Sequence, residues 1–121
     1  MAAADEWSVV FCVDASGTSP VEAFLARLDQ RTQVRFAWSI EQLRLRNIQA
    51  REPLVRHLEG KLWELRRESD TNIYRLLCVF LSGRRILFLH GFHKKTQKTP
   101  RRELETVLRR LQDFIERGGG A

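Results

Sequence analysis

The sequence predicts an α+β protein in which helices pack against a small, mostly antiparallel sheet. Two observations lead to this class. Segments rich in aliphatic and aromatic residues cluster between positions 61 and 93, and the last two of them are separated by only two residues. Segments with apolar residues at helical spacing lie before and after this cluster, not between its members. Grouped strands flanked by helices are typical of the α+β class, and the predicted order is β-α-α-β-β-β-α.

The first predicted strand covers residues 7–13, WSVVFCV, which are rich in β-formers. A glycine-containing loop follows at residues 14–18. Ser19 then has the position of a helix cap, Pro20 suits a first turn, and Glu22 completes a capping box. The helix predicted from this start has apolar residues at helical spacing: Val21, Phe24, Leu25 and Leu28.

A second helix is predicted over residues 32–47, and its apolar residues lie on two faces. One face carries Val34, Ala37, Trp38 and Leu45, and the other carries Phe36, Ile40 and Leu43. A helix with this pattern is expected to be contacted on more than one side. Residues 53–60, which begin with a proline and end with a glycine, are predicted to form an irregular connection that includes His57.

Three further strands are predicted at residues 61–66, 73–81 and 84–93, with Ser82 and Gly83 forming a tight hairpin between the last two. Thr99 and Pro100 then open a helix with one apolar stripe. We predict a single domain over residues 1–117 and a flexible tail over the glycine-rich residues 118–121. The apolar stripe of the last helix comprises Leu104, Val107, Leu108, Leu111, Phe114 and Ile115.

The positive charge of the chain is concentrated in one part of the sequence. The formal net charge is +6, but residues 71–102 contain eight basic residues and no acidic residue. The remainder has 13 basic and 15 acidic residues. Since a surface charged only for solubility mixes both signs, this bias favours an anion-binding face. The eight basic residues are Arg75, Arg84, Arg85, Lys94, Lys95, Lys98, Arg101 and Arg102.

Several classes of protein are disfavoured by composition. No apolar run approaches the length of a membrane span, and MAAADEW lacks the features of a signal peptide, so a cytoplasmic location is expected. Cys12 and Cys78 lie in apolar runs without zinc-ligand spacing, which predicts two buried thiols and no metal site. Neither HExxH nor a paired-carboxylate motif occurs, and we expect no cofactor.

Two arginines stand within predicted strands, where an unpaired charge is costly to bury. Arg66 and Arg75 could meet on neighbouring strands. They could form a salt bridge with Glu64, or they could await an anion such as phosphate, which suits the donor fork of arginine.

The stretch LHGFHKKTQKTP, residues 89–100, joins the last strand to the last helix and is the most distinctive part of the sequence. Gly91 is expected to allow close approach of another backbone or a ligand. Phe92 is either part of the core or a platform for base stacking. His93 is the histidine placed inside the charge cluster, and histidine exchanges protons near neutral pH.

LWELR, the later YR pair and GFHKKTQKTP together resemble the phage-derived HigB-like toxins of the RelE superfamily, from about residue 7 to residue 114. The resemblance implies a RelE-like fold and an mRNA endoribonuclease of a type II toxin–antitoxin system. It implies a catalytic face with Arg66, Arg75, His93, Lys94 and Lys95. Some members have a C-terminal tyrosine near the cleaved phosphate, whereas the single tyrosine of this chain is Tyr74.

The implied reaction needs no metal, because the ribose 2′-OH can attack the adjacent phosphate with the help of an acid, a base and cations. Partners implied by the resemblance are mRNA, the ribosome and a helix-turn-helix antitoxin, through which alone operator DNA would be bound. Two alternatives stay open: a non-catalytic nucleic-acid-binding module, and a regulatory protein whose basic face docks an acidic segment. Further residues expected to bind RNA are Arg84, Arg85, Phe92, Lys98, Arg101 and Arg102.

Overall fold

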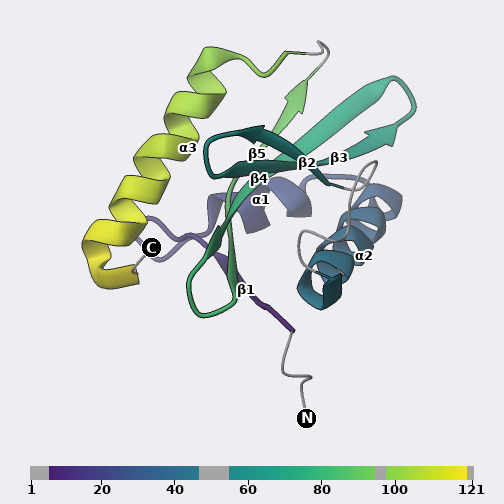
Figure 1. The fold of residues 1–121 in the computed structure, drawn as a ribbon. Helices are drawn as coiled ribbons and strands as arrows, with labels where there is room; N and C mark the ends of the chain where they lie inside the picture. Colours follow the sequence, from purple (N-terminus) through teal and green to yellow (C-terminus); the bar gives the residue numbers. More distant parts are fainter. Residues whose placement is uncertain (1–5, 47–54, 95–97, 120–121) are drawn as a thin grey trace.

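A computed structural model describes residues 6–46, 55–94 and 98–119 of the chain (Figure 1). Five strands form one sheet in the order β1-β5-β4-β3-β2, and three α-helices pack on it, which confirms the α+β class and is consistent with a small RelE-like fold. The elements are β1 (Ser8–Phe11), α1 (Pro20–Ala26), α2 (Gln30–Arg46), β2 (Val55–Glu59), β3 (Leu62–Ser69), β4 (Asn72–Leu81), β5 (Arg85–Lys94), α3 (Arg101–Phe114) and a π-helical turn, η2 (Ile115–Gly119).

The predicted order lacks one strand, because β2 lies in the stretch expected to be an irregular connection. β2 pairs antiparallel with β3, and the turn between them contains Gly60 at a φ of +53°. The segment VRHLE mixes polar and apolar residues and is flanked by turn-forming residues, so its pattern alone resembles a loop. As an edge strand it needs to bury few side chains, and only Val55 is fully buried.

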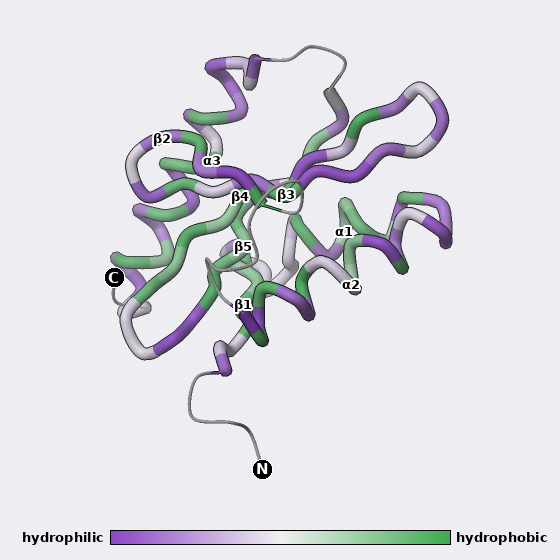
Figure 2. Tube along the Cα trace, turned by 45° about the vertical axis from the view of Figure 1, so that its right-hand side comes forward, coloured by the Kyte–Doolittle hydropathy of each residue, from purple (hydrophilic) through white to green (hydrophobic). Residues whose placement is uncertain are grey.

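The remaining strands pair as an antiparallel meander, except that β1 runs parallel to β5. The β4–β5 hairpin turns through Gly83 and Arg84, both with positive φ, so Arg84 belongs to the turn and not to the strand predicted for it. At the other end of the sheet, the mostly hydrophilic tip of the β3–β4 hairpin extends past the core (Figure 2). Arg66 and Arg67 near this tip are partly exposed, whereas Arg75 is buried.

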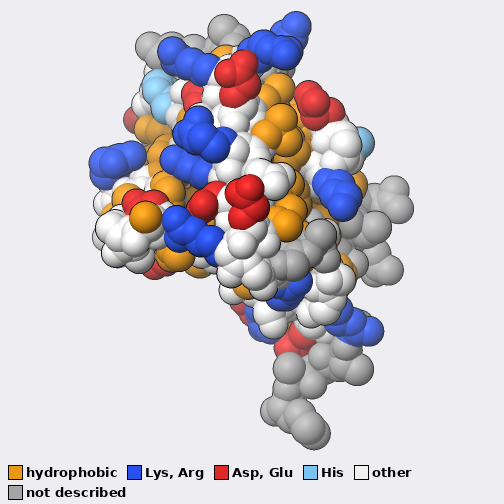
Figure 3. Space-filling model, turned by 90° about the vertical axis from the view of Figure 1, so that its left-hand side faces the viewer, with side chains coloured by type: hydrophobic (Ala, Val, Ile, Leu, Met, Phe, Trp, Pro, Cys, Tyr) orange, Lys and Arg blue, Asp and Glu red, His pale blue; other side chains and the backbone are white. Residues whose placement is uncertain are grey.

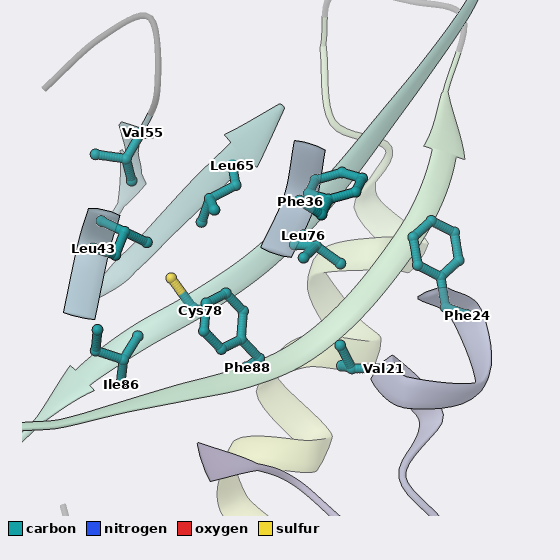
Figure 4. Packing of buried hydrophobic residues seen from close by; sticks show 10 residues of the cluster. All are labelled: Val21, Phe24, Phe36, Leu43, Val55, Leu65, Leu76, Cys78, Ile86 and Phe88. Carbon is teal, nitrogen blue, oxygen red and sulfur yellow. The ribbon is translucent and has the colours of Figure 1, made fainter. Parts of the chain in front are cut away.

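Two hydrophobic clusters hold helices on opposite faces of the sheet. One lies between the sheet and the helices α1 and α2, with Phe24, Phe36 and Leu43 pointing toward Leu76 and Phe88 (Figure 4). The other lies under α3. The predicted stripe of α3 is confirmed at its centre by Val107, but Leu108 and Ile115 are exposed. The second cluster comprises Cys12, Leu62, Leu77, Val79, Leu81, Leu87, Leu89, Phe92 and Val107.

The helix starts follow local chemistry. The Ser19 hydroxyl accepts a hydrogen bond from the Glu22 backbone N–H at 3.2 Å, as predicted, and Pro20 occupies the first turn. α2 begins at Gln30, two residues before its predicted start, because the Asp29 carboxylate accepts hydrogen bonds from the backbone N–H and hydroxyl of Thr32.

The structure shows what surrounds the two glycine positions singled out in the sequence. The close approach expected at Gly91 is made by the ring of Phe24 from α1: a Cβ at this position would lie 2.3 Å from a ring carbon. The tail predicted to be flexible begins at Gly118, within η2, and the carbonyl of Gly119 accepts a hydrogen bond from Arg85 at 2.6 Å. Residues 120 and 121 lie outside the described part.

Candidate functional site

A buried carboxylate, Glu64, organises the α3 side of the sheet. Its side chain is 2% exposed and forms an ion pair with Arg75, which is 1% exposed. Arg56 from β2 donates to Glu64 Oε1 at 3.1 Å, and the Thr99 hydroxyl donates to Oε2 at 3.4 Å. Since Thr99 stands just before α3, this carboxylate links β2, β3, β4 and the approach to the last helix.

The two arginines predicted to bind the scissile phosphate have different environments. Arg66 and Arg75 are cross-strand partners and share a face, as strand parity requires. Arg66 is partly exposed and pairs with Glu68, whereas Arg75 is enclosed and pairs with Glu64. The salt-bridge alternative is therefore present for Arg75. In this arrangement its guanidinium cannot reach a solvent-borne phosphate, although its Nε–H has no hydrogen-bond partner among the described residues.

A second row of side chains crosses the opposite face of the sheet near the same end. Arg67 on β3 is the register partner of Tyr74 on β4, and Tyr74 is the partner of His93 on β5. The rings of Tyr74 and His93 are 5.2 Å apart, and His93 is exposed. Because neighbouring strands are about 4.8 Å apart, the Cα atoms of Arg67 and His93 are separated by roughly 10 Å. His93 therefore shares a face with Arg67 and not with Arg75.

Arg67 was not among the residues predicted to act in the site. Its Nε and Nη2 donate to the hydroxyl of Ser39 on α2 at 2.9 and 2.7 Å, and its guanidinium lies 5.6 Å from the centre of the Trp38 ring. None of the salt bridges found among the described residues involves Arg67. Partial burial, together with the charge of Arg35, lowers the pKa of Arg67, which indicates an uncompensated cation. The environment of Arg67 follows from the packing of β3 against α2, which the sequence pattern does not indicate.

Most of the basic segment follows His93 in the chain. Lys94 ends β5, but its side chain and all of Lys95 lie outside the described residues. Lys98, Arg101 and Arg102 are exposed ahead of and within the first turn of α3, and Arg101 pairs with Glu105. Positive charge therefore continues from the tip of β5 into α3.

The structure does not gather all predicted RNA-binding residues into one surface. Arg84 and Arg85 lie at the opposite end of β5 from His93, about 26 Å away for eight extended residues. Phe92 is 6% exposed within the core, which does not fit the stacking role predicted for it. In Figure 3, the lysine and arginine side chains on the α3 side alternate with acidic and hydrophobic ones.

His90 forms a separate polar group beneath α3. Arg110 Nη1 donates to His90 Nδ1 at 2.9 Å, and also to the Leu89 carbonyl. Because a guanidinium only donates, Nδ1 is the acceptor, and Nε2 carries the proton that it donates to Glu103 at 2.8 Å. Burial lowers the pKa of His90, against the opposing effect of the Glu103 carboxylate. The neutral tautomer therefore fits this position.

We expect acid to destabilise the protein through His90. With a lowered pKa in the folded state, the contribution of His90 is complete above its ordinary pKa of 6.5 and is lost as the pH falls toward the folded pKa. His90→Gln keeps a donor and an acceptor but does not titrate. Urea unfolding at about pH 7.5 and pH 5 should show a smaller loss of stability for the variant than for the wild type. Equal losses would contradict the prediction.

The two cysteines of the chain lie in the core. Cys12 and Cys78 are buried free thiols, as predicted, and burial raises the pKa of both. Within the described ranges, no group of three or more His, Cys, Asp or Glu side chains is placed to hold a metal ion.

An open cavity of about 380 Å³ lies between the β1–α1 loop and the second half of α3; Cys12, Asp14, Arg109 and Arg117 are among its lining residues. No helix in the described part could span a membrane.

Comparison with known families matches residues 23–112 to the profile of the phage-derived Gp49-like proteins, DUF891. This match covers most of the sheet together with α2 and α3. The chain belongs to this family. Gp49-like proteins are associated with RelE-like toxins, in agreement with the fold. No curated protein matches this Gp49-like chain at a significant level.

Proposed function

We propose that this Gp49-like protein is the toxin of a type II toxin–antitoxin system and is a HigB-like endoribonuclease that cuts mRNA during translation. The observation that carries the proposal is the row of Arg67, Tyr74 and His93 at the open end of the sheet. The residues that follow this row in the chain, 94–102, contain basic but no acidic side chains. Membership of the Gp49-like family supports it.

RNA cleavage by this route needs proton transfer at two oxygens. A base removes the proton of the 2′-OH, which attacks the phosphate, and an acid protonates the departing 5′-oxygen, which leaves a 2′,3′-cyclic phosphate. We assign one of these transfers to His93, because it is exposed at the strand tip. Tyr74, whose ring lies beside His93, supports the imidazole and offers a hydroxyl near the reacting atoms.

Charge that builds on the phosphorane requires fixed cations. Arg67 fits this role because it is held by Ser39, while no carboxylate among the described residues neutralises it. Arg66, Lys94, Lys95 and Lys98 are assigned to the neighbouring phosphates. The buried pair of Arg75 and Glu64 has a positioning role: it holds β3 and β4 in the register that aligns the row above.

The partners follow from the same proposal. The mRNA is presented by the ribosome, and a cognate antitoxin of the helix-turn-helix class masks the toxin and alone binds operator DNA. The exposed cations Lys98, Arg101 and Arg102 are suited to the first interaction through release of counterions.

Product analysis tests the proposal. Purified protein is added to ribosomes translating a defined message, and cleavage is mapped by primer extension and by the chemistry of the new ends. We expect cuts that carry 2′,3′-cyclic phosphates and that are blocked by a single 2′-deoxy substitution at the cut nucleotide. RNA that is bound but left intact would instead identify a non-catalytic binding module.

A further inference from the structure

The outer face of α2 carries an apolar stripe that the fold does not use. Val34, Trp38 and Leu45 are 60%, 55% and 40% exposed. Their spacing of four and seven residues places them on one side of the helix, over about 16 Å of its axis. The opposite side of α2 supplies Phe36 and Leu43 to the core (Figure 4). Of the two apolar faces predicted for this helix, the outer one therefore stays largely exposed.

Arginines flank this stripe, and one acid, Glu41, lies on it between Trp38 and Leu45. α2 contains four arginines and a single acid, Glu41, which is held by Arg44 in a salt bridge. Arg31 and Arg46 are exposed beside the stripe. At its middle, Arg67 from β3 packs on Trp38, and Arg35 reaches across to the carbonyl of Glu68. The strip is flanked by Arg31, Arg35 and Arg67, none of which forms a salt bridge with another described residue. Such a strip is complementary to a surface that is apolar at its centre and acidic at its edges.

We infer that the outer face of α2 is a docking surface for an acidic amphipathic helix of a protein partner. Leucine-like side chains of the partner would pack on Val34, Trp38 and Leu45, and flanking carboxylates would pair with Arg35 and Arg67. The two helices would pair along their apolar faces as in a coiled coil, with apolar residues recurring at intervals of three or four. The inference does not depend on the proposed ribonuclease activity.

Two observations favour a protein helix over single-stranded RNA at this surface. Bases bind by stacking on open aromatic rings, but one face of the Trp38 ring is already covered by the guanidinium of Arg67. Val34 and Leu45 are aliphatic and have no role in base stacking, whereas they extend the contact that a helix would make. The exposed area therefore suits a partner with regularly spaced apolar side chains.

A peptide-binding experiment tests this surface. The probe is a labelled peptide of about 15 residues, on the order of four helical turns, with leucines at helical spacing and glutamates between them. Its companions are a scrambled peptide of the same composition and an oligouridylate of similar length. Fluorescence anisotropy measures the dissociation constant of each for the full-length protein.

The test variant is Val34→Ser with Leu45→Ser, which leaves Arg67 and the row containing His93 intact. The matched control is Val13→Ser with Leu108→Ser, two equally exposed aliphatic residues elsewhere, and circular dichroism checks both folds. We expect the amphipathic peptide to bind the wild type and the control alike and the test variant at least about tenfold more weakly. The inference is overturned if the amphipathic peptide does not bind, if the scrambled peptide binds equally well, or if only oligouridylate responds to the Val34 and Leu45 changes.

Discussion

Replacing Arg75 by alanine is expected to lower the free energy of unfolding by about 3–5 kcal/mol, because it leaves the buried carboxylate of Glu64 without its main partner. Glu64→Ala should have a similar effect for the converse reason. The loss is large because neither group can recover its hydration in the folded state. Urea unfolding followed by circular dichroism measures it.

Arg66→Ala is the matched control, since Arg66 faces Arg75 across the same strand pair. Its ion pair with Glu68 is partly exposed, so we expect a change of about 0–1 kcal/mol. The double variant Glu64→Leu with Arg75→Met should recover much of the lost stability, because two apolar side chains can replace a buried ion pair. An Arg75→Ala protein as stable as the wild type would disprove the structural role of this pair.

Replacing His93 by alanine is expected to reduce mRNA cleavage by roughly 100-fold or more, the usual contribution of a general acid or base. Arg67→Gln should cause a comparable loss if Arg67 stabilises the phosphorane. Both substitutions should leave the fold intact, because His93 is exposed and the amide of a glutamine at position 67 can still donate to the Ser39 hydroxyl. Rates are measured as primer-extension signal over time on translating ribosomes, with binding measured separately.

His57→Ala is the matched control for His93, because His57 is also exposed but lies on β2, with its Nε2 near the Gly60 carbonyl. Unchanged cleavage by the His57 variant together with a slow His93 variant would separate chemistry from general surface effects. If His93→Ala cleaves at the wild-type rate, His93 is not the acid or base. A loss of RNA affinity equal to the loss of rate would assign Arg67 to binding alone.

Local patterns predicted much of this fold. Ser19 and Pro20 marked the start of α1, and the expectation that Arg66 and Arg75 could meet on neighbouring strands is confirmed by their register. β2 was missed because an edge strand with one buried residue has almost no periodic signal. The basic segment was correctly seen as one run in the sequence, yet Arg84 and Arg85 lie far from His93, because an extended strand separates its ends.

The sequence by itself determined the class of fold, the faces of the strands and the charge of residues 71–102, since these depend on residues close together in sequence. Only the tertiary structure decided which charges are free. Glu64 on β3 forms an ion pair with Arg75 on β4. Ser39 and Trp38 on α2 contact Arg67, and neither carries a charge that could neutralise it. Whether an arginine is a structural ion or an available cation depends on the neighbours and solvent that packing assigns to it, and strand parity carries no information about either.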